Sequence, residues 1–413
     1  MKPFYYQATN MKKPSLFLLN ILAITLSLKS GLFYASPSLD NLNAPPPAVN
    51  NPIITPTPPA LNAKAYILID VNSGKIIAEK NSEEKLAPAS LTKIMTLYVI
   101  SNALKQNQIH LTDLIRISRE AWQTPGSRMF VKEGQQVSIQ DLLKGIIVDS
   151  GNDACVAMAE QLGGSENGFA QIMNFQAKQL GMNSTHFTDS TGLPNPNLYT
   201  TAKDLAILSR SLINNFPEYY PWYKQKWFSF NGIRQANRNR LLWRDGQVDG
   251  VKTGHTDEAG FCLVSSAKRG NMRILAVLLG SPNDTSRADD SDRLLNYGFR
   301  FFETHELYQA GVKVTEVPLY KGMQNTIQAG LNRTLSITIP TGQYQHLAIS
   351  TNVAKYLQAP FKKGDKLGEV VVKFDNNIIA TEHLYALNDA PVGGKFTRMK
   401  DSVRIMYKRW FSA

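Results

Sequence analysis

Apolar residues fall into short runs separated by turn signals along much of the chain, which is the pattern of β-strands. The run at residues 65–70 is followed by Asn72-Ser73-Gly74 and by a second run at 75–79, and this order predicts a β-hairpin. Residues 246–281 predict an antiparallel set of three strands, closed by a helix from 286 to about 304. The three strands are expected at 248–254, 261–267 and 273–279.

The segment between the hairpin and the antiparallel set has a helical period instead. Residues 88–100 contain one proline, at their start, and are apolar on nearly every face, so they predict a helix that is buried all round. Residues 141–148 and 153–162 predict two more helices, separated by a tight break at 149–152. After about residue 307, short β-like runs between Gly and Pro turns predict a small all-β domain.

The buried helix carries a possible nucleophile. Lys93 would lose hydration there, and desolvation lowers the pKa of a lysine. Ser90 precedes Lys93 by three residues, so the hydroxyl and the amine share one helix face. A serine beside a partly neutral amine is a candidate nucleophile, but an incidental lysine that reaches solvent is the alternative. The same Ser-x-x-Lys spacing recurs at Ser82…Lys85 and Ser265…Lys268, neither of which opens an apolar helix.

Two further polar clusters lie at element ends. Ser150 and Asn152 occupy the break between two helices, where ordinary N-capping would explain both residues. Lys252-Thr253-Gly254 places a cation, a hydroxyl and a residue without a side chain at the end of a strand, where Gly254 would let a ligand lie close. A charged strand terminus with a glycine bulge is the alternative there. Each cluster by itself is a weak signal.

The N-terminal region has the composition of an export signal and a tether. Lys12-Lys13 precede an apolar run that is short for a membrane span, which predicts a signal peptide within residues 1–36, with an uncleaved anchor as the alternative. Residues 37–62 are rich in Pro and Asn and predict an extended linker.

The C-terminal region predicts a basic amphipathic helix behind Gly393-Gly394. An apolar stripe recurs there at spacings of three and four, made of Phe396, Met399, Val403, Met406 and Trp410. The stripe would lie on an anionic membrane or pack on its own domain. We favour the membrane because six cations surround so narrow a stripe.

Composition narrows the possible chemistry. The chain has 413 residues and a net charge of +12, which indicates an anionic partner or surface. Cys155 and Cys262 are the two cysteines, too few for a disulfide scaffold or a multi-cysteine zinc site, and we expect two buried thiols. The six histidines show no ligand spacing, so we expect no metal and no other cofactor. Trp222, Trp227 and Trp243 are expected to be packing residues.

Taken together, the three weak clusters are a strong signal. They occur in the order Ser-x-x-Lys, Ser-x-Asn, Lys-Thr-Gly, which is the set found in penicillin-binding proteins and serine β-lactamases. The stretches 88–96 (PASLTKIMT), 149–154 (DSGNDA) and 250–256 (GVKTGHT) resemble the D-alanyl-D-alanine carboxypeptidases, the low-molecular-mass penicillin-binding proteins. The resemblance implies an α/β (α+β) β-lactamase/transpeptidase-like domain with an antiparallel sheet and a helical subdomain.

The resemblance also implies a layout for the whole chain. A small all-β domain and the amphipathic helix would follow the catalytic domain. The expected boundaries are 1–36 for the signal, 37–62 for the linker, 63–305 for the catalytic domain, 306–390 for the β-rich domain and 391–413 for the anchor helix.

By the same resemblance, the catalytic residues are Ser90, Lys93 and Ser150. Ser90 would attack the carbonyl between the last two D-alanines of a peptidoglycan stem peptide, and Lys93 would take its proton. Ser150 would relay a proton to the leaving D-alanine. The backbone N–H groups of Ser90 and His255 would form the oxyanion hole. A β-lactam would acylate Ser90 in the same way and act as a covalent inhibitor.

The remaining residues of the motifs would bind substrate. Lys252 and Thr253 would hold the terminal carboxylate, Gly254 would let the substrate lie against the strand, and Asn152 would orient the substrate amide. The expected location is the periplasmic face of the cytoplasmic membrane, as a peripheral protein. Stem peptides, β-lactams and an anionic membrane are therefore the expected partners, and no nucleic acid is expected.

Three alternative functions remain. A class A β-lactamase would carry a glutamate in a Glu-x-x-x-Asn pattern, and none lies between Ser150 and Lys252. An endopeptidase of the same superfamily would cut crosslinks rather than stem ends, and the sequence barely separates the two. A non-enzymatic wall-binding protein is disfavoured because the motif residues are intact.

Overall fold

The computed structural model describes residues 55–411. The predicted signal peptide at 1–36 and most of the predicted linker at 37–62 lie outside the described residues. None of the helices within 55–411 combines the length and the apolar character that crossing a membrane requires.

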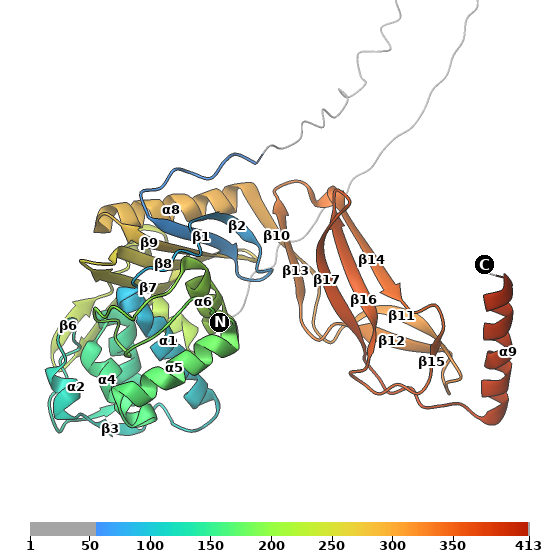
Figure 1. Ribbon diagram of the computed structural model, residues 1–413, viewed down its shortest axis with the longest axis horizontal. Helices are drawn as coiled ribbons and strands as arrows, with labels where there is room; N and C mark the ends of the chain where they lie inside the picture. The colour runs from blue at the N-terminus through green and yellow to red at the C-terminus, as the bar shows by residue number, and fades with distance from the viewer. Residues whose placement is uncertain (1–54, 412–413) are drawn as a thin grey trace, which may run out of the picture. The chain divides into compact units, whose positions relative to one another are not determined.

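A five-stranded antiparallel sheet with the order β2-β1-β9-β8-β7 organises the first part of the described chain (Figure 1). The predicted hairpin and the predicted three-strand set are both confirmed, and β1 joins them by pairing with β9. This arrangement leaves β7 at an edge of the sheet. The strands are β1 (Ala65–Asp70), β2 (Ile76–Lys80), β7 (Val248–Thr256), β8 (Gly260–Arg269) and β9 (Met272–Ser281).

Helices cover both faces of this sheet (Figure 1). Alternate residues of β1 point to opposite faces, so Ile67 belongs to the core of the helical region and Leu68 to the core below α8 (Asp284–Phe301). The helical region surrounds α1 (Lys93–Lys105), which is buried on nearly every face, as its sequence predicts. The other helices are α2 (Arg119–Gln123), α3 (Ile139–Lys144), the π-helical turn η3 (Gly145–Asp149), α4 (Asn152–Gly163), α5 (Glu166–Leu180), α6 (Ala202–Asn215), η4 (Tyr220–Lys224) and α7 (Leu241–Arg244).

Two small hairpins lie beside the helices. The strands are β3 (Leu114–Arg116) with β4 (Gln136–Ser138), and β5 (Trp227–Phe230) with β6 (Ile233–Ala236).

The part after α8 is almost entirely β-structure, as predicted. Its strands form a six-stranded sheet with the order β14-β16-β17-β12-β11-β15 and a pair, β10 with β13. Aliphatic side chains such as Ile327, Val370 and Leu384 fill a core of its own. The strands are β10 (Phe302–Tyr308), β11 (Lys313–Tyr320), β12 (Thr326–Gly330), β13 (Leu335–Pro340), β14 (Leu347–Val353), β15 (Leu357–Gln358), β16 (Lys366–Phe374) and β17 (Asn377–Ala386), with the turn η5 (Tyr344–His346) before β14.

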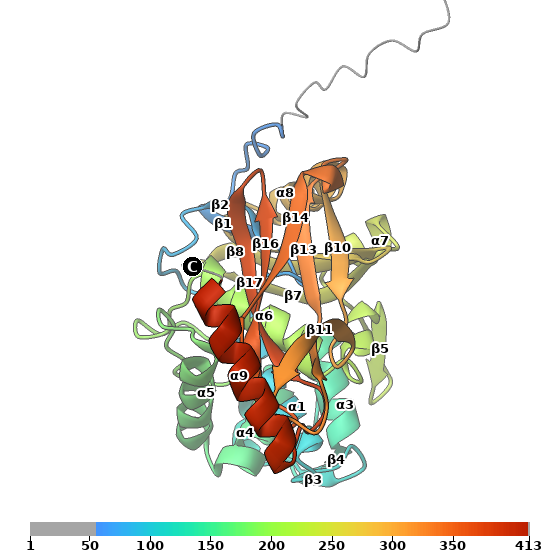
Figure 2. The same cartoon turned by 90° about the vertical axis from the view of Figure 1, so that its right-hand side faces the viewer.

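The last described element is the predicted amphipathic helix, α9 (Lys395–Phe411) (Figure 2). Asp401 and Ile405 are buried, and an Asp401 carboxylate oxygen accepts a hydrogen bond from the Lys321 N–H at 2.6 Å. The five residues of the apolar stripe are between 57% and 85% exposed. The helix therefore contacts its own domain through a different face, and the stripe is left open.

Some local expectations differ from the structure. The helix expected from 286 to 304 ends at Phe301, because the chain turns into β10 at the next residue. Trp227 and Trp243 were expected to be packing residues; their rings pack edge to face on each other, but they remain 44% and 42% exposed. The expectation of two buried thiols is confirmed, since Cys155 and Cys262 are buried and unpaired.

Candidate active site

The serine of the first motif lies on a tight turn before α1. Residues 89–92 form a 3-10 turn (η2, Ala89–Thr92), and Ala89 has a positive φ of 49°. Backbone conformations of this kind are costly for residues other than glycine and cluster at functional sites. The turn brings the Ser90 hydroxyl to 2.9 Å from Nζ of Lys93, the first residue of α1.

Lys93 is fully buried, and its amine is held from a second side. Its Nζ donates to the Thr191 carbonyl at 2.6 Å. The Asp189 carboxylate shapes that loop by accepting hydrogen bonds from the N–H groups of Thr191 and Gly192. Burial lowers the pKa of Lys93, and the nearby acids offset this only in part. Lys93 therefore does not reach solvent, as the alternative interpretation required, and its surroundings favour a neutral amine beside Ser90.

The second motif occupies the connection between η3 and α4. Ser150 has a φ of 60°, and the N-cap of α4 is Gly151 with no side-chain hydrogen bond. The ordinary capping explanation for Ser150 and Asn152 therefore fails. The Ser150 hydroxyl instead accepts a hydrogen bond from Nζ of Lys252 at 2.9 Å, although the two residues are 102 positions apart.

Asn152 presents one unused hydrogen-bonding atom. Its amide nitrogen donates to the Pro125 carbonyl at 2.7 Å, whereas its buried Oδ1 has no partner within residues 55–411. An unpaired buried acceptor is costly unless a ligand supplies the donor. Gly126 lies against this amide, and a Cβ there would approach Nδ2 of Asn152 to 2.6 Å. Asn152 is thus fixed in place with a free acceptor.

The third motif lies on β7, next to the backbone of Ser90. A Cβ on Gly254 would come within 2.9 Å of the Pro88 carbonyl and 3.2 Å of the Ser90 nitrogen, so only glycine allows this approach. Lys252 is 3% exposed, and burial, reinforced by the neighbouring Lys93 and Arg238, lowers its pKa well below the usual value. A bound anion would favour the charged form of Lys252 again.

One cavity of about 680 Å³ joins the three motifs. Ser90, Ser150, Thr253, Gly254 and His255 line it, while Lys93, Asn152 and Lys252 are buried and reach Ser90, the Pro125 loop and Ser150 through the contacts above. The structure therefore brings together all eight residues that the sequence singled out.

The cavity also contains three arginines that the sequence reasoning missed, Arg238, Arg240 and Arg287. Arg238 and Arg287 line it; Arg238 donates to the Ser127 hydroxyl at 2.7 Å, and Arg287 donates to the Gly254 carbonyl at 3.2 Å. They lie on segments without a motif, so nothing in the sequence pointed to them beyond the basic run Arg238-Asn-Arg240. Together with Lys252 they give the cavity the charge that an anionic substrate requires.

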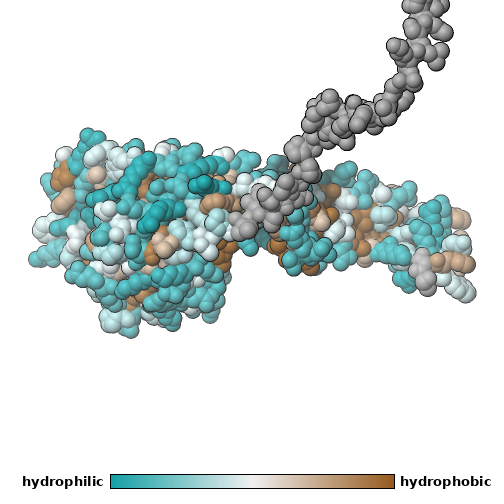
Figure 3. All heavy atoms as spheres, turned by 90° about the horizontal axis from the view of Figure 1, so that it is seen from above, coloured by the Kyte–Doolittle hydropathy of each residue, from teal (hydrophilic) through white to brown (hydrophobic). Residues whose placement is uncertain are grey.

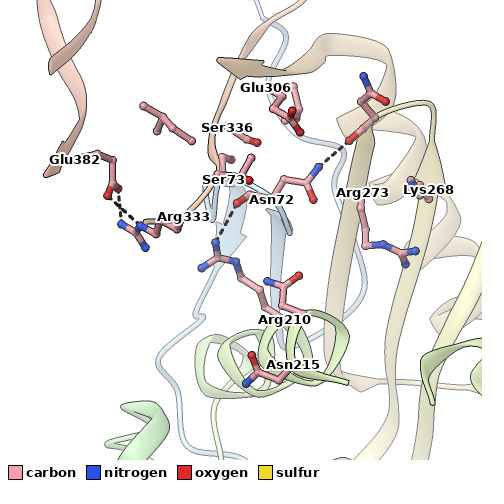
Figure 4. Close-up of a pocket in the computed structure, with 15 residues that line it drawn as sticks. Asn72, Ser73, Arg210, Asn215, Lys268, Arg273, Glu306, Arg333, Ser336 and Glu382 are labelled. Atoms are coloured by element: carbon pink, nitrogen blue, oxygen red, sulfur yellow. Dashed lines mark hydrogen bonds and ion pairs between the residues drawn. The ribbon is translucent and has the colours of Figure 1, made fainter. Parts of the chain in front are cut away.

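A second cavity, of about 740 Å³, lies where β1–β2 and α6 meet the β-rich part (Figure 4). Two of its cations are already engaged: Arg210 donates to the Val71 and Asn72 carbonyls, and Arg333 pairs with Glu382 (Figure 4). None of the motif residues lines it, so the chemistry lies in the smaller cavity.

Asp149, just before Ser150, is a buried acid with an incomplete hydrogen-bond set. It is 2% exposed, and its Oδ1 has no partner within the described range 55–411. Burial raises its pKa to about 7; Asp153 adds to the rise, and Arg238 and Lys252 oppose it. The folded protein therefore holds a proton here that the unfolded chain loses near its ordinary pKa of 3.8.

We predict that Asp149→Asn removes a pH dependence of stability. Since the folded pKa is raised, the contribution of the protonated acid is complete below about pH 4 and declines as pH rises towards 7. Asparagine does not ionise, so the Tm of the variant relative to wild type should rise by roughly 3 °C or more between pH 4 and pH 8. Thermal unfolding at both pH values measures this, with the exposed Asp257→Asn as control. A flat difference, or the same rise in the control, would contradict the prediction.

The fold and the site together define a class of protein. An antiparallel sheet with a helical region, and a Ser-Lys pair, a Ser-x-Asn loop and a Lys-Thr-Gly edge strand around one cavity, characterise the serine penicillin-binding proteins and β-lactamases. Comparison with known proteins agrees. Residues 53–283 match the family described as D-alanyl-D-alanine carboxypeptidase, and residues 302–391 match the penicillin-binding protein 5 C-terminal domain.

Similar proteins cover most of the chain. The D-alanyl-D-alanine carboxypeptidase DacC of Escherichia coli is 43% identical over 363 residues, which is 86% of this chain and 91% of that protein. The crystal structure of penicillin binding protein 5 from Haemophilus influenzae is 42% identical, with a TM-score of 0.77, over 81% of this chain and 99% of that one. Penicillin-binding protein D2 from Listeria monocytogenes, solved in its ampicillin-bound form, is 30% identical with a TM-score of 0.54, over 58% of this chain and 98% of that one.

The chain therefore belongs to the D-alanyl-D-alanine carboxypeptidase family of serine penicillin-binding proteins. The predicted family and the predicted fold class, a transpeptidase-like α/β domain followed by a β domain and a C-terminal helix, are both confirmed.

Proposed function

We propose that the protein is a serine-type D-Ala-D-Ala carboxypeptidase that removes the terminal D-alanine of peptidoglycan stem pentapeptides through an acyl-enzyme on Ser90. The observation that carries the proposal is the fully buried Lys93 amine, 2.9 Å from the Ser90 hydroxyl at the floor of a cationic cavity. Family membership supports the same reaction.

In the acylation half-reaction, Lys93 in its neutral form takes the proton of the Ser90 hydroxyl. The Ser90 oxygen bonds to the carbonyl carbon of the penultimate D-alanine, and the N–H groups of Ser90 and His255 stabilise the negative oxygen that develops. The C–N bond then breaks, and Ser150 passes its proton to the nitrogen of the leaving D-alanine while it regains one from the protonated Lys93, which restores the neutral amine.

Substrate binding uses the other polar groups of the cavity. The terminal carboxylate binds to Lys252 and Thr253 in a charge-assisted contact, and the positive charge of Arg238 and Arg287 reinforces this attraction. The unpaired Oδ1 of Asn152 accepts a hydrogen bond from a substrate amide. Gly254 leaves room for the peptide along β7, the edge strand of the sheet.

In the deacylation half-reaction, water attacks the ester carbonyl while Lys93 takes a proton from the water. The bond between the carbonyl carbon and the Ser90 oxygen then breaks, and Lys93 returns the proton to that oxygen, which regenerates Ser90. A β-lactam enters the same acylation step because its ring carbonyl takes the place of the scissile amide. The β-lactamase alternative is disfavoured because the chain has no Glu-x-x-x-Asn pattern between Ser150 and Lys252, where a class A enzyme carries the glutamate that activates this water.

The test is release of free D-alanine from a soluble pentapeptide that ends in D-Ala-D-Ala, run beside covalent labelling by a fluorescent penicillin. Release together with labelling supports the carboxypeptidase. Labelling without release would indicate the endopeptidase or a wall-binding protein, and rapid penicillin hydrolysis without release would indicate a β-lactamase.

We also propose the division of the chain into a catalytic domain at 63–305, a β-rich domain at 306–390 and an anchor segment at 391–413, behind an export signal at 1–36 and a linker at 37–62. Separate hydrophobic cores support the first boundary between domains. The protein would then lie at the periplasmic face of the cytoplasmic membrane.

The geometry of α9 supports binding to an anionic membrane. Its apolar stripe is exposed, and hydrophobic residues are visible at that end of the described chain in Figure 3. The stripe is flanked by Lys395, Arg398, Lys400, Arg404, Lys408 and Arg409. Apolar side chains insert between lipid headgroups, while the cations bind their phosphates.

We predict that Val403→Asp strongly reduces binding to anionic vesicles. Val403 is 57% exposed on the stripe, so the change leaves the fold intact but places a carboxylate in the lipid interface. Co-sedimentation with phosphatidylglycerol vesicles should fall by roughly 10-fold or more in a protein lacking residues 1–36. The control is Ile378→Asp, at an apolar β17 position that is 62% exposed. Membrane binding that survives both Val403→Asp and deletion of residues 395–413 would refute the anchor.

A further inference from the structure

The β5–β6 hairpin has one buried and one open face. Phe228 of β5 is 7% exposed and belongs to the main core, and Gln235, opposite it on β6, donates to the Arg128 carbonyl at 2.8 Å. Because neighbouring positions in a strand point to opposite sides, Trp227 and Arg234 face the other way. The hairpin is therefore anchored through one face while the other is presented to solvent.

Trp227 and Arg234 of this open face and Trp243 of the neighbouring α7 form a cluster, which we call the tryptophan ledge. The rings of Trp227 and Trp243 meet edge to face, with centroids 6.0 Å apart and an interplanar angle of 87°. The Arg234 guanidinium lies 4.4 Å from the centroid of the Trp227 ring. Both rings are more than 40% exposed, at 44% and 42%. Neighbouring apolar side chains that are left open on a surface in this way can mark a ligand-binding site.

The ledge is continuous with the active-site cavity. Trp227 is paired directly with Ala236, so their side chains share a face of the hairpin at a separation of about 5 Å between Cβ atoms. Ala236 lines the cavity that contains Ser90, and so do Arg238 and Arg240. Arg240 is held by an ion pair with Asp284 at 2.6 Å, which fixes the segment that joins the hairpin to α7 and Trp243.

We propose that the tryptophan ledge binds the sugar strand to which the stem peptide is attached. This inference rests on the proposed function, since it concerns the part of the same substrate that cannot fit the cavity. The peptide end is held at Ser90, and the rest of a polymeric substrate must leave the cavity across its rim. The ledge lies on that rim.

The chemistry of the ledge suits an amino-sugar ring. One side of a pyranose presents C–H groups, which pack on the electron-rich face of an aromatic ring. Two perpendicular rings form a corner that contacts a sugar on two sides. The Arg234 guanidinium lies over the Trp227 ring, where its N–H donors would reach hydroxyl and acyl oxygens of a sugar bound beside it. A stem peptide alone would need no aromatic surface of this size.

The test compares three substrates that all end in D-Ala-D-Ala: a short acylated tripeptide, a free stem pentapeptide, and the same pentapeptide attached to a disaccharide. The variants are Trp227→Ala and Trp243→Ala in the otherwise complete protein. We expect kcat/KM for the disaccharide substrate to fall roughly 3- to 10-fold in each variant, mainly through KM, while both peptide substrates are unaffected. The control is Phe175→Ala on α5, which removes an aromatic ring that is 59% exposed.

The other outcomes are distinguishable. If each variant has the same kcat/KM as wild type for every substrate, the proposal is overturned. A loss that is also seen with the free pentapeptide would assign the ledge to the stem peptide instead of the sugar. A loss with all three substrates would show that the tryptophans only support the fold. If wild type released no D-alanine from any substrate, the proposed function itself would fail. The ledge is tested separately by calorimetry: if the tryptophan variants bind the disaccharide pentapeptide as tightly as wild type does, the sugar-binding proposal is overturned.

Discussion

Replacing Ser90 with alanine should abolish both D-alanine release and covalent labelling by penicillin. The change removes the one oxygen placed to form the acyl bond, 2.9 Å from Nζ of Lys93, and leaves the turn before α1 intact. We expect kcat for D-alanine release to drop by roughly 10³-fold or more, because the remaining groups of the site bind substrate but cannot form the ester. Release of D-alanine and fluorescence of the labelled protein on a denaturing gel measure the two effects.

The chain supplies a matched control for Ser90. Ser82 also precedes a lysine by three residues and is 7% exposed, but its hydroxyl donates to Glu79 and it lies outside the cavity. Ser82→Ala should keep wild-type activity and labelling. Full peptidase activity in Ser90→Ala would remove the proposed mechanism. Loss of labelling with D-alanine release retained would point to a reaction that does not pass through Ser90.

Replacing Lys93 with methionine should stop acylation without unfolding the protein. Methionine has a similar length and is apolar, so it suits a site where the lysine is fully buried. Without the amine, no base accepts the Ser90 proton, and we expect the rate of penicillin labelling to fall by about 10²- to 10⁴-fold. The Tm should be unchanged or higher, because burying an amine is unfavourable.

The pH profile separates this role from a structural one. Since burial lowers the pKa of Lys93, the neutral amine is present at lower pH than for an exposed lysine, and acylation by wild type should rise as pH rises through that lowered pKa. The Lys93→Met variant should lose this rising limb. Lys85→Met is the control, since Lys85 has the same spacing from a serine but lies over the Tyr199 ring at 4.5 Å. Labelling of Lys93→Met at the wild-type rate and with the wild-type pH profile would refute Lys93 as the base.

Much of the fold could be predicted from the sequence because the patterns that indicate it are local. The hairpin of β1 and β2, the three strands β7 to β9 and the fully buried α1 follow from residue periods and turn residues within a few positions of each other. The Ser90–Lys93 pair is local too, since three residues span about one helical turn and set the hydroxyl beside the amine. The amphipathic stripe of α9 was also predicted from a local pattern, the spacing of its apolar residues.

Other features depended on contacts between segments far apart in the chain. Ser150 and Asn152 had a complete local explanation as helix caps, and only the geometry at Gly151 and the bond from Lys252 removed it. Arg238 and Arg287 carry no motif, and they enter the site because the segment after β6 and the helix α8 meet at the same cavity. Trp227 and Trp243 were expected to pack in the core because they are aromatic. The sequence does not show which side of a short hairpin faces the core.

The sequence by itself pointed to Ser90 as the proposed nucleophile, and it determined the three motifs, the order of the strands along the chain and the amphipathic character of the C-terminal helix. The tertiary structure alone decided that Ser150 binds Lys252, that Asn152 keeps an open acceptor, and that a tryptophan ledge borders the cavity. The physical reason is the distance along the chain over which each effect acts. Periodicity and turn chemistry act over three or four residues. The burial and desolvation of a residue, and whether its hydrogen-bonding atoms find partners, are set by the distant segments that pack against it.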